Sequence, residues 1–357
     1  MASSSDSCSW PTPEPTATAT ATLEPTLTAT PPPSPTTEPT STPAVVVAPV
    51  VGMIHLPNIS HDWQRFNNCG PVSTSMALSF YGVNLSQYEI APVVKGAATD
   101  TNAAPYELSR FISDQGLVAP VRFNGDLDTL RELLSNNIPV IVEQWLDRPD
   151  DELTAHYRLV RGYDQASGVF IVNDSYVGPN LRYSEADFDQ WWVAFHRVYL
   201  PVYRPEQEPL VRAIIGEENW PDEVMWRQAL TRAEQESQSN PTLYSWYNLG
   251  EARLRLGDHA GAVAAFETAL GSGVPVRWPW YVFAHLEAFN VTGHYDRVLQ
   301  VTQPYVNAKV EEIHYHRGWA LEGLGRPQEA LAEYRLAVSL NPRFQRAVEA
   351  RDRLGGR

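Results

Sequence analysis

The stretch between residues 66 and 82 carries a clear helical pattern. Pro71 suits a first helical turn, where its missing N–H costs nothing, and Gly82 is a typical residue just after a helix end. Between them, apolar side chains recur at a spacing of four and would share one buried face: Val72, Met76 and Phe80. The pattern predicts a helix that begins close to Cys69.

Two further helices are expected, at residues 105–115 and 126–136. Either Asp100 or Thr101 would cap the first of them, and Asp126 would cap the second, because a short polar side chain can accept a hydrogen bond from a free N–H of the first turn.

Short apolar or alternating runs predict four strands, at residues 139–142, 156–163, 168–174 and 195–203. The turn Asp164–Gly168 separates the second strand from the third, so these two would form a hairpin. Helices mixed with hairpin strands indicate an α+β domain, which we place at residues 51–204.

The C-terminal part of the chain, residues 205–357, contains an internal repeat. Seven positions recur with a constant offset of 68 residues, which is twice 34: Trp246, Leu249, Gly250, Gly257, Ala262, Phe266 and Ala269 align with His314, Arg317, Gly318, Gly325, Ala330, Tyr334 and Ala337. Small residues at helix crossings and an aromatic residue in the second helix match the tetratricopeptide pattern. We therefore expect an all-α solenoid with a concave face that binds a protein or peptide.

The other repeat units are less regular. Residues 220–241 resemble a degenerate first unit, residues 277–310 form a divergent middle unit, and residues 335–354 would supply the last helix and cap. Aromatic residues of the middle unit are interpreted as core and repeat interface rather than as a ligand site: Trp278, Trp280, Tyr281 and Phe283. A solenoid that only shields or stabilises the first domain is the alternative.

Residues 1–50 have a different composition from the rest of the chain. Ten prolines and twelve threonines lie between Pro11 and Pro43, and such a segment can bury little apolar surface, so we expect a disordered linker. Stalks of this kind are usually extracytoplasmic. The sequence shows no signal peptide, so we expect an export or anchor segment further upstream; a cytoplasmic disordered tail is the alternative.

Charge and residue content exclude several classes of partner. A formal net charge of −15 argues against binding to nucleic acid or to anionic membranes, both of which need basic patches. No apolar run reaches the length of a membrane span. The spacing of cysteines and histidines does not indicate a zinc site, and we expect neither a metal nor a cofactor.

Cys69 is the candidate for chemistry. A thiol at a helix N-terminus is favoured as the thiolate by the helix dipole and free N–H groups. A thiol nucleophile needs a base, a group that orients the base and a donor for the oxyanion. Of the four histidines between residues 51 and 204, His156 lies on a strand whose hairpin partner ends at Asp174, and Gln64 precedes Cys69 by five residues.

These residues resemble a known family. Gln64 followed by Asn68-Cys69-Gly70-Pro71, the strand from His156 and the turn at Asp174 are similar to the papain-like double-glycine (bacteriocin-leader) peptidases, in particular to relatives that are not fused to transporters. The resemblance implies a papain-like fold with Cys69 as nucleophile, His156 as base, Asp174 as orienting group and Gln64 as oxyanion donor.

Two departures accompany this resemblance. The spacing from Gln64 to Cys69 is one residue shorter than in the transporter-fused members, and the spacing from His156 to Asp174 is longer. Neither removes a chemical group. The double-glycine substrate is not carried over, because no transporter or leader partner is visible in the sequence.

We therefore expect a thiol hydrolase that cleaves peptide bonds through an acyl-enzyme, joined to a tetratricopeptide scaffold. Two alternatives stay open. An acyl transferase would use the same catalytic residues and pass the acyl group to an amine, whereas a non-catalytic module would only bind peptides. The sequence does not define the substrate or the cleavage preference.

Overall fold

A computed structural model describes residues 45–97, 100, 102–148 and 151–355. The chain from Val45 onward forms one compact unit. Most of the predicted linker, residues 1–44, lies outside the described residues. The boundaries proposed at residues 50 and 204 stay predictions.

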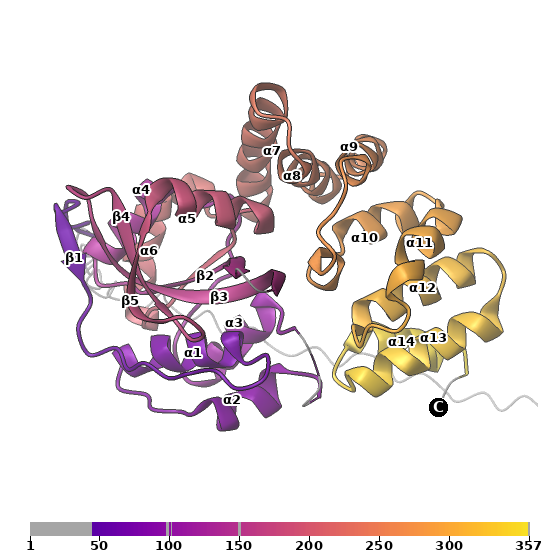
Figure 1. Cartoon of the computed structure of the whole chain (residues 1–357), viewed down its shortest axis with the longest axis horizontal. Helices are drawn as coiled ribbons and strands as arrows, with labels where there is room; N and C mark the ends of the chain where they lie inside the picture. The colour runs from indigo at the N-terminus through magenta and orange to yellow at the C-terminus, as the bar shows by residue number, and fades with distance from the viewer. Residues whose placement is uncertain (1–44, 98–99, 101, 149–150, 356–357) are drawn as a thin grey trace, which may run out of the picture. The chain divides into compact units, whose positions relative to one another are not determined.

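The first part of this unit is a mixed domain of helices and antiparallel strands (Figure 1). Its elements in chain order are β1 (Met53–His55), α1 (Cys69–Phe80), α2 (Gln87–Val94), α3 (Pro105–Asp114), α4 (Leu127–Ser135), β2 (Val140–Arg148), β3 (Asp151–Asp164), β4 (Val169–Asp174), β5 (Gly178–Ser184), α5 (Glu185–Trp192) and β6 (Tyr199–Pro201). The sheet order is β5-β4-β3-β2-β6, with β1 paired to β3. The predicted α+β class is confirmed.

The register of the sheet brings distant residues onto one face. In the β3–β4 hairpin Arg158 lies opposite Asp174, and in the β2–β3 pair Gln144 lies opposite His156. Because side chains two residues apart on a strand share a face, His156 and Arg158 both point to the side of the sheet on which Asp174 lies.

Some elements differ from the sequence-based predictions. The last strand is Tyr199–Pro201 rather than residues 195–203, because His196 and Arg197 adopt left-handed backbone conformations with φ of 51° and 48°. The cap of α3 is Ala104 and not Asp100, whose carboxylate instead accepts hydrogen bonds from the N–H groups of Gly96 and Asn102. Thr101 lies outside the described residues. Asp126 caps α4 as predicted, accepting from the N–H of Thr129.

The second part is a helical repeat array, and the predicted 68-residue offset is confirmed in its packing. Its helices are α6 (Glu208–Ile215), α7 (Asp222–Ser239), α8 (Leu243–Arg255), α9 (His259–Gly271), α10 (Ala284–Val291), α11 (Tyr295–Thr302), α12 (Glu311–Gly323), α13 (Pro327–Leu340) and α14 (Gln345–Arg353). Gly250 on α8 packs against the Phe266 ring on α9, and Gly318 on α12 packs in the same way against Tyr334 on α13. The degenerate first unit, residues 220–241, contributes the single long helix α7.

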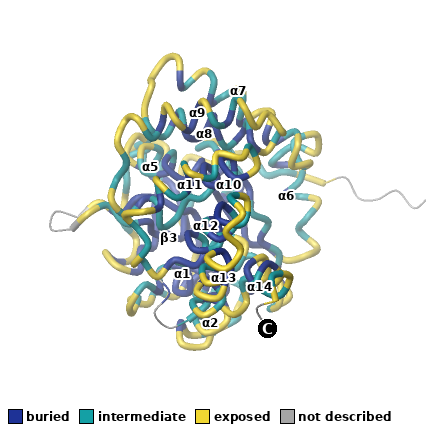
Figure 2. The backbone as a smooth tube through the Cα atoms, turned by 90° about the vertical axis from the view of Figure 1, so that its right-hand side faces the viewer, coloured by how far each residue is buried: buried dark blue, intermediate teal, exposed yellow. Residues whose placement is uncertain are grey.

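One large hydrophobic cluster spans both parts of the compact unit. Buried Trp145 and Phe195 of the sheet domain and buried Tyr247 and Trp278 of the repeat array belong to one hydrophobic cluster. Figure 2 shows buried segments in β3 and α1 as well as in the repeat helices α10 and α12. Such shared burial means that the two parts stabilise each other.

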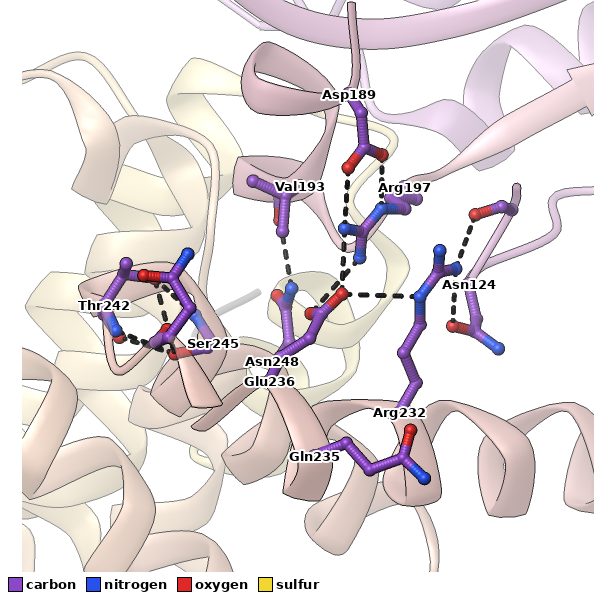
Figure 3. Close-up of polar contacts among 12 residues, drawn as sticks. Asn124, Asp189, Val193, Arg197, Arg232, Gln235, Glu236, Thr242, Ser245 and Asn248 are labelled. Carbon is purple, nitrogen blue, oxygen red and sulfur yellow. Dashed lines mark hydrogen bonds and ion pairs between the residues drawn. The ribbon is translucent and has the colours of Figure 1, made fainter. Parts of the chain in front are cut away.

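Polar contacts also join the repeat array to the sheet domain (Figure 3). Arg197 forms ion pairs with Asp189 near the end of α5, at 2.6 Å, and with Glu236 of α7, at 2.9 Å. Asn248 on α8 donates to the backbone carbonyl of Val193 at 3.0 Å. Because Arg197 and Asn248 are themselves buried, these bonds are protected from water and fix α7 and α8 against the end of α5.

Candidate active site

Cys69 is the first residue of α1, with Asn68 as the N-cap. The thiol is free and half-buried. The side chain of Asn68 is buried and donates to Gln87 of α2 at 3.0 Å, which fixes the turn before the helix. Pro71 continues into the helix, so the predicted position of Cys69 at a helix N-terminus is confirmed.

His156 lies beside this thiol, in the middle of β3 and not at its start. Its imidazole is buried, and Nε2 lies 2.8 Å from Oδ1 of Asp174. The ring also hydrogen-bonds to the Cys69 side chain. Because Nε2 is engaged by Asp174, Nδ1 is the nitrogen that faces sulfur. The structure thus brings three predicted residues into one hydrogen-bonded chain.

Asp174 is fully buried and accepts several hydrogen bonds. Besides His156, its Oδ1 accepts from the backbone N–H groups of Tyr176 at 2.7 Å and Val177 at 2.9 Å. Its Oδ2 accepts from Nε of Arg158 at 2.8 Å. Both carboxylate oxygens are therefore oriented by partners other than His156, which fixes the imidazole in turn.

Arg158 is a site residue that the sequence analysis missed. It is buried, its Nη1 donates to the carbonyl of Trp145 at 3.0 Å, and its guanidinium stacks on the rings of Tyr183 and Trp191. The signal was available, because Arg158 follows His156 by two residues on one strand and so shares its face. Buried between aromatic rings, its positive charge acts together with His156 to lower the pKa of Asp174.

The neighbouring Asn173 does not contact His156 among the described residues. Its Oδ1 accepts from the N–H of Asn180 at 3.1 Å on β5, and from Arg161 at 3.5 Å. The alternation of side chains along β4 therefore directs Asp174 and not Asn173 toward the imidazole.

Gln64 lies in the loop before α1 and is tied to the end of β4. Its backbone N–H donates to the carbonyl of Ser175 at 2.8 Å, and its Oε1 accepts from the Ser175 hydroxyl at 2.8 Å. No described residue accepts a hydrogen bond from its Nε2. The amide N–H therefore stays available to a ligand, while the amide oxygen is fixed.

The electrostatic environment of the site favours a thiolate–imidazolium ion pair between Cys69 and His156. Burial alone would raise the pKa of Cys69, but the hydrogen bond and charge of His156 and backbone N–H bonds at Tyr157 and Gly70 lower it below its ordinary value. Burial would lower the pKa of His156, yet Asp174 and the thiolate raise it. His156 and Arg158 hold the pKa of Asp174 well below its usual range, although burial acts in the opposite direction.

The other three histidines of this domain have different partners. His55 contacts Asn180, His61 contacts the backbone carbonyl of Asp174 at 3.0 Å, and His196 forms an ion pair with Glu251 of the repeat array at 3.1 Å. None of the three hydrogen-bonds to the Cys69 thiol in the part of the chain that the structure describes.

The described residues contain no group of three or more His, Cys, Asp or Glu side chains placed to hold a metal ion. Each helix among them is too short or too polar to cross a bilayer.

Comparison with known protein families gives matches over parts of the chain. Residues 53–200 match the Peptidase_C39 like family. We call this segment the C39-like domain. Residues 226–275 and 311–344 match tetratricopeptide repeat families. The family resemblance inferred from the sequence, including the repeats that follow, is confirmed.

Two solved structures are similar to part of the chain. One is the peptidase domain of Streptococcus ComA, a bi-functional ABC transporter involved in a quorum sensing pathway, with 16% identity, a TM-score of 0.33, and coverage of 41% of this chain and 98% of that one. The other is a double glycine motif protease from an AMS/PCAT transporter in complex with the leader peptide, with 15% identity, a TM-score of 0.31, and coverage of 42% and 94%. No curated protein matches the chain.

Proposed function

We propose that this protein is a cysteine peptidase that hydrolyses peptide bonds through an acyl-enzyme, with Cys69, His156 and Asp174 as its catalytic triad. The observation that carries the proposal is the hydrogen-bonded chain from the Cys69 thiol through His156 to Asp174. The match of residues 53–200 to a peptidase family supports it.

In the first half-reaction the Cys69 thiolate attacks the carbonyl carbon of the substrate, and the carbon–oxygen double bond becomes an oxyanion. His156, which carries the thiol proton, then gives it to the nitrogen of the leaving amine. The carbon–nitrogen bond breaks, the amine product leaves, and the acyl group remains on sulfur as a thioester. Asp174 orients the imidazolium and stabilises its charge.

In the second half-reaction a water molecule gives a proton to the neutral imidazole and attacks the thioester. The carbon–sulfur bond breaks, the acid product leaves, and the thiolate–imidazolium pair is restored. Gln64 is the proposed oxyanion donor in both steps, because its Nε2 is free among the described residues and its Oε1 is held by Ser175.

The same triad could pass the acyl group to an amine instead of water. An experiment must therefore distinguish this acyl transferase from a hydrolase. A purely peptide-binding module is less consistent with the site, since burial of a charged His156–Asp174–Arg158 network is costly without a function that uses it. A protein partner on the concave repeat face, and display outside the cytoplasm, remain proposals that rest on the repeat pattern and on composition.

An active-site thiol probe followed by mass spectrometry tests the proposal. We expect a peptide-based electrophile to label Cys69 stoichiometrically in the native protein and to label His156→Ala far more slowly. Equal labelling of the two proteins would contradict the assigned base. Addition of an amine acceptor to a cleavage reaction would identify transfer, because a new amide product would appear at the expense of the acid.

A further inference from the structure

A cavity of about 970 Å³ lies between the C39-like domain and the inner side of the repeat array. The C39-like domain contributes α3, β2 and the segment around Phe195. The repeat array contributes α8, the segment 281–287, α12 and the loop 341–346. We call this cavity the chamber. Aromatic residues make up much of its wall, among them Phe111, Phe195, Tyr247, Tyr281, Phe283 and Phe344.

The wall of the chamber reaches the catalytic residues through the divergent repeat unit. The hydroxyl of Tyr281 hydrogen-bonds to the backbone of Ala155, the residue before His156. The same hydroxyl interacts electrostatically with Cys69. Arg277 donates to Thr154 on the same strand at 2.8 Å. Tyr281 and Phe283 pack against the hydrophobic core, as predicted, and they also line the chamber, whereas Trp278 is fully buried.

Glu143 is a carboxyl of the chamber wall that is close enough to Cys69 to interact with its charge. It lies on β2 opposite Tyr157, to which it hydrogen-bonds, and the backbone of Tyr157 in turn hydrogen-bonds to Cys69. Only 6% of Glu143 is exposed. No described Lys, Arg or His forms an ion pair with it, and neither the triad nor the oxyanion donor uses it.

The environment of Glu143 lacks a positive charge. Burial, together with the charge of Cys69, raises its pKa to about 8, so that the carboxyl is mostly protonated at neutral pH. Burial raises the pKa of Glu107, another carboxyl of the chamber wall, to about 7. A cation that entered the chamber would restore the ionised form of such a group and would gain a charged hydrogen bond.

The positive charges of the chamber are not placed to neutralise Glu143. Arg255 forms ion pairs with Glu251 and Glu287, and the guanidinium of Arg343 donates to the backbone carbonyls of Pro92 and Lys95. Two further arginines of the lining, Arg110 and Arg346, have exposed side chains. The arginines of the chamber wall therefore either bind other protein groups or face the solvent.

We propose that the chamber binds the substrate segment that continues from the scissile bond at Cys69, and that Glu143 binds a positively charged side chain of that segment, Lys or Arg. The inference rests on the proposed peptidase function and adds a substrate class to it. The aromatic wall would hold the aliphatic part of such a side chain and stack on its charged end.

Binding to the Cys69→Ala variant tests the chamber without any need for turnover. The probes are nonapeptides of Ala, Ser and Gly in which one Lys is moved through every position, each paired with a peptide that carries norleucine instead. We expect one or two positions at which Lys binds at least about tenfold more tightly than norleucine, since a desolvated charge pair is worth this much. The additional Glu143→Gln substitution should abolish the difference, because the amide keeps the shape of the carboxyl but cannot take a charge.

Glu206→Gln is the matched control, because it makes the same change at an exposed position that is not part of the chamber lining and should leave the Lys preference in place. A second readout needs no change at Glu143. In the Cys69→Ala variant burial, the largest cause, still raises the pKa of Glu143, and the titratable groups that face its carboxyl are Tyr157 and Tyr281. Lys peptides should therefore release protons on binding as Glu143 ionises, whereas norleucine peptides should not. Calorimetry in two buffers measures this release.

An unchanged Lys preference in the Glu143→Gln variant, or the absence of a preference at every position, would overturn the inference. Failure of the proposed function looks different. In that case the wild-type protein would not cleave any of the peptides, while the Glu143-dependent preference for Lys would persist in binding.

Discussion

Single side chains decide the chemistry of this site, and Asp174 has the largest number of partners. It receives hydrogen bonds from a histidine, an arginine and two backbone N–H groups. Charged hydrogen bonds of this kind are the strong ones. The carboxylate therefore holds His156 in place. Because His156 lowers the pKa of the Cys69 thiol, Asp174 affects that pKa indirectly.

The pH dependence of Cys69 follows from these contacts. Its lowered pKa means that the thiolate persists below the value of about 8.5 that is usual for a free cysteine, and the raised pKa of His156 means that the imidazolium persists above about 6.5. Alkylation by iodoacetamide should therefore have a midpoint below pH 8.5, and activity should fall again when His156 loses its proton. In His156→Ala the midpoint should move upward. A midpoint at the free-cysteine value in the wild-type protein would contradict this account.

Substitutions at the end of β4 separate the roles of its last two residues. Asp174→Ala should lower kcat by about ten- to a thousand-fold, because orientation of the base is one part of catalysis. Asn173→Ala should change kcat little and cost stability instead, since its side chain supports β5. Steady-state kinetics on folded variants decide, and the reverse ranking of the two kcat values would assign the orienting role to Asn173.

The sequence allowed prediction of where candidate site residues lie when local sequence order sets their position. Cys69 was found because a helix start is visible in Pro71 and in the apolar spacing, and His156 and Asp174 because a hairpin brings its two strands together. Arg158 and Glu143 were missed because their importance depends on what is buried around them. Arg158 is buried by Tyr183 and Trp191 of the same domain, whereas Glu143 lies beside Tyr281 of the repeat array, and no local pattern encodes either kind of packing.

Helices and strands set the positions of these side chains. The Cys69 helix packs on β3, and Gln87 of α2 holds the preceding loop by donating to Asp62 and to the carbonyl of Trp63 at 2.8 and 2.9 Å. The helices α2 and α5 were not predicted, since both are short and neither has a strong apolar period. The repeat helices were predicted well, because their small residues and aromatic residues recur at a fixed offset.

Close helix packing in the repeats predicts the effect of adding a single methyl group. A Cβ at position 318 would lie 2.6 Å from the Tyr334 ring, so Gly318→Ala should destabilise the protein by about 1–3 kcal/mol despite the better helix propensity of Ala. Gly271 of α9 is the matched control, because a Cβ there meets no atom within 4 Å. Gly271→Ala should leave stability unchanged or slightly higher. Urea denaturation measures both, and equal effects would contradict the packing argument.

The chain as a whole depends on contacts between its two folded parts. Arg122 of the C39-like domain is buried and donates to the carbonyls of Trp220 and Asn219 at 2.9 and 2.8 Å, and it pairs with Asp222 at 3.2 Å. Trp145 on β2 donates to the hydroxyl of Tyr244 at 2.8 Å. Deletion of the repeat array would expose these groups, so point substitutions are the better tests of its role.

Loss of the Arg122 contacts should weaken the whole unit. Arg122→Leu should lower the free energy of unfolding by about 2–4 kcal/mol, because two part-buried carbonyls lose their donor at once. Arg227→Leu is the control, since Arg227 forms an exposed pair with Glu223 within α7 and such a pair is worth less than about 1 kcal/mol. Chemical denaturation followed by fluorescence should show the difference. Equal losses would mean that the two parts are only weakly joined.

The central claim, hydrolysis through Cys69, is tested most directly by cleavage of a complex peptide mixture in water enriched with ¹⁸O. The reduced wild-type protein should generate new peptide C-termini that each carry ¹⁸O, detected by mass spectrometry, and Cys69→Ala with an unchanged melting temperature should generate none. New termini in both proteins, or no cleavage by the wild-type protein with its thiol reduced, would contradict the account.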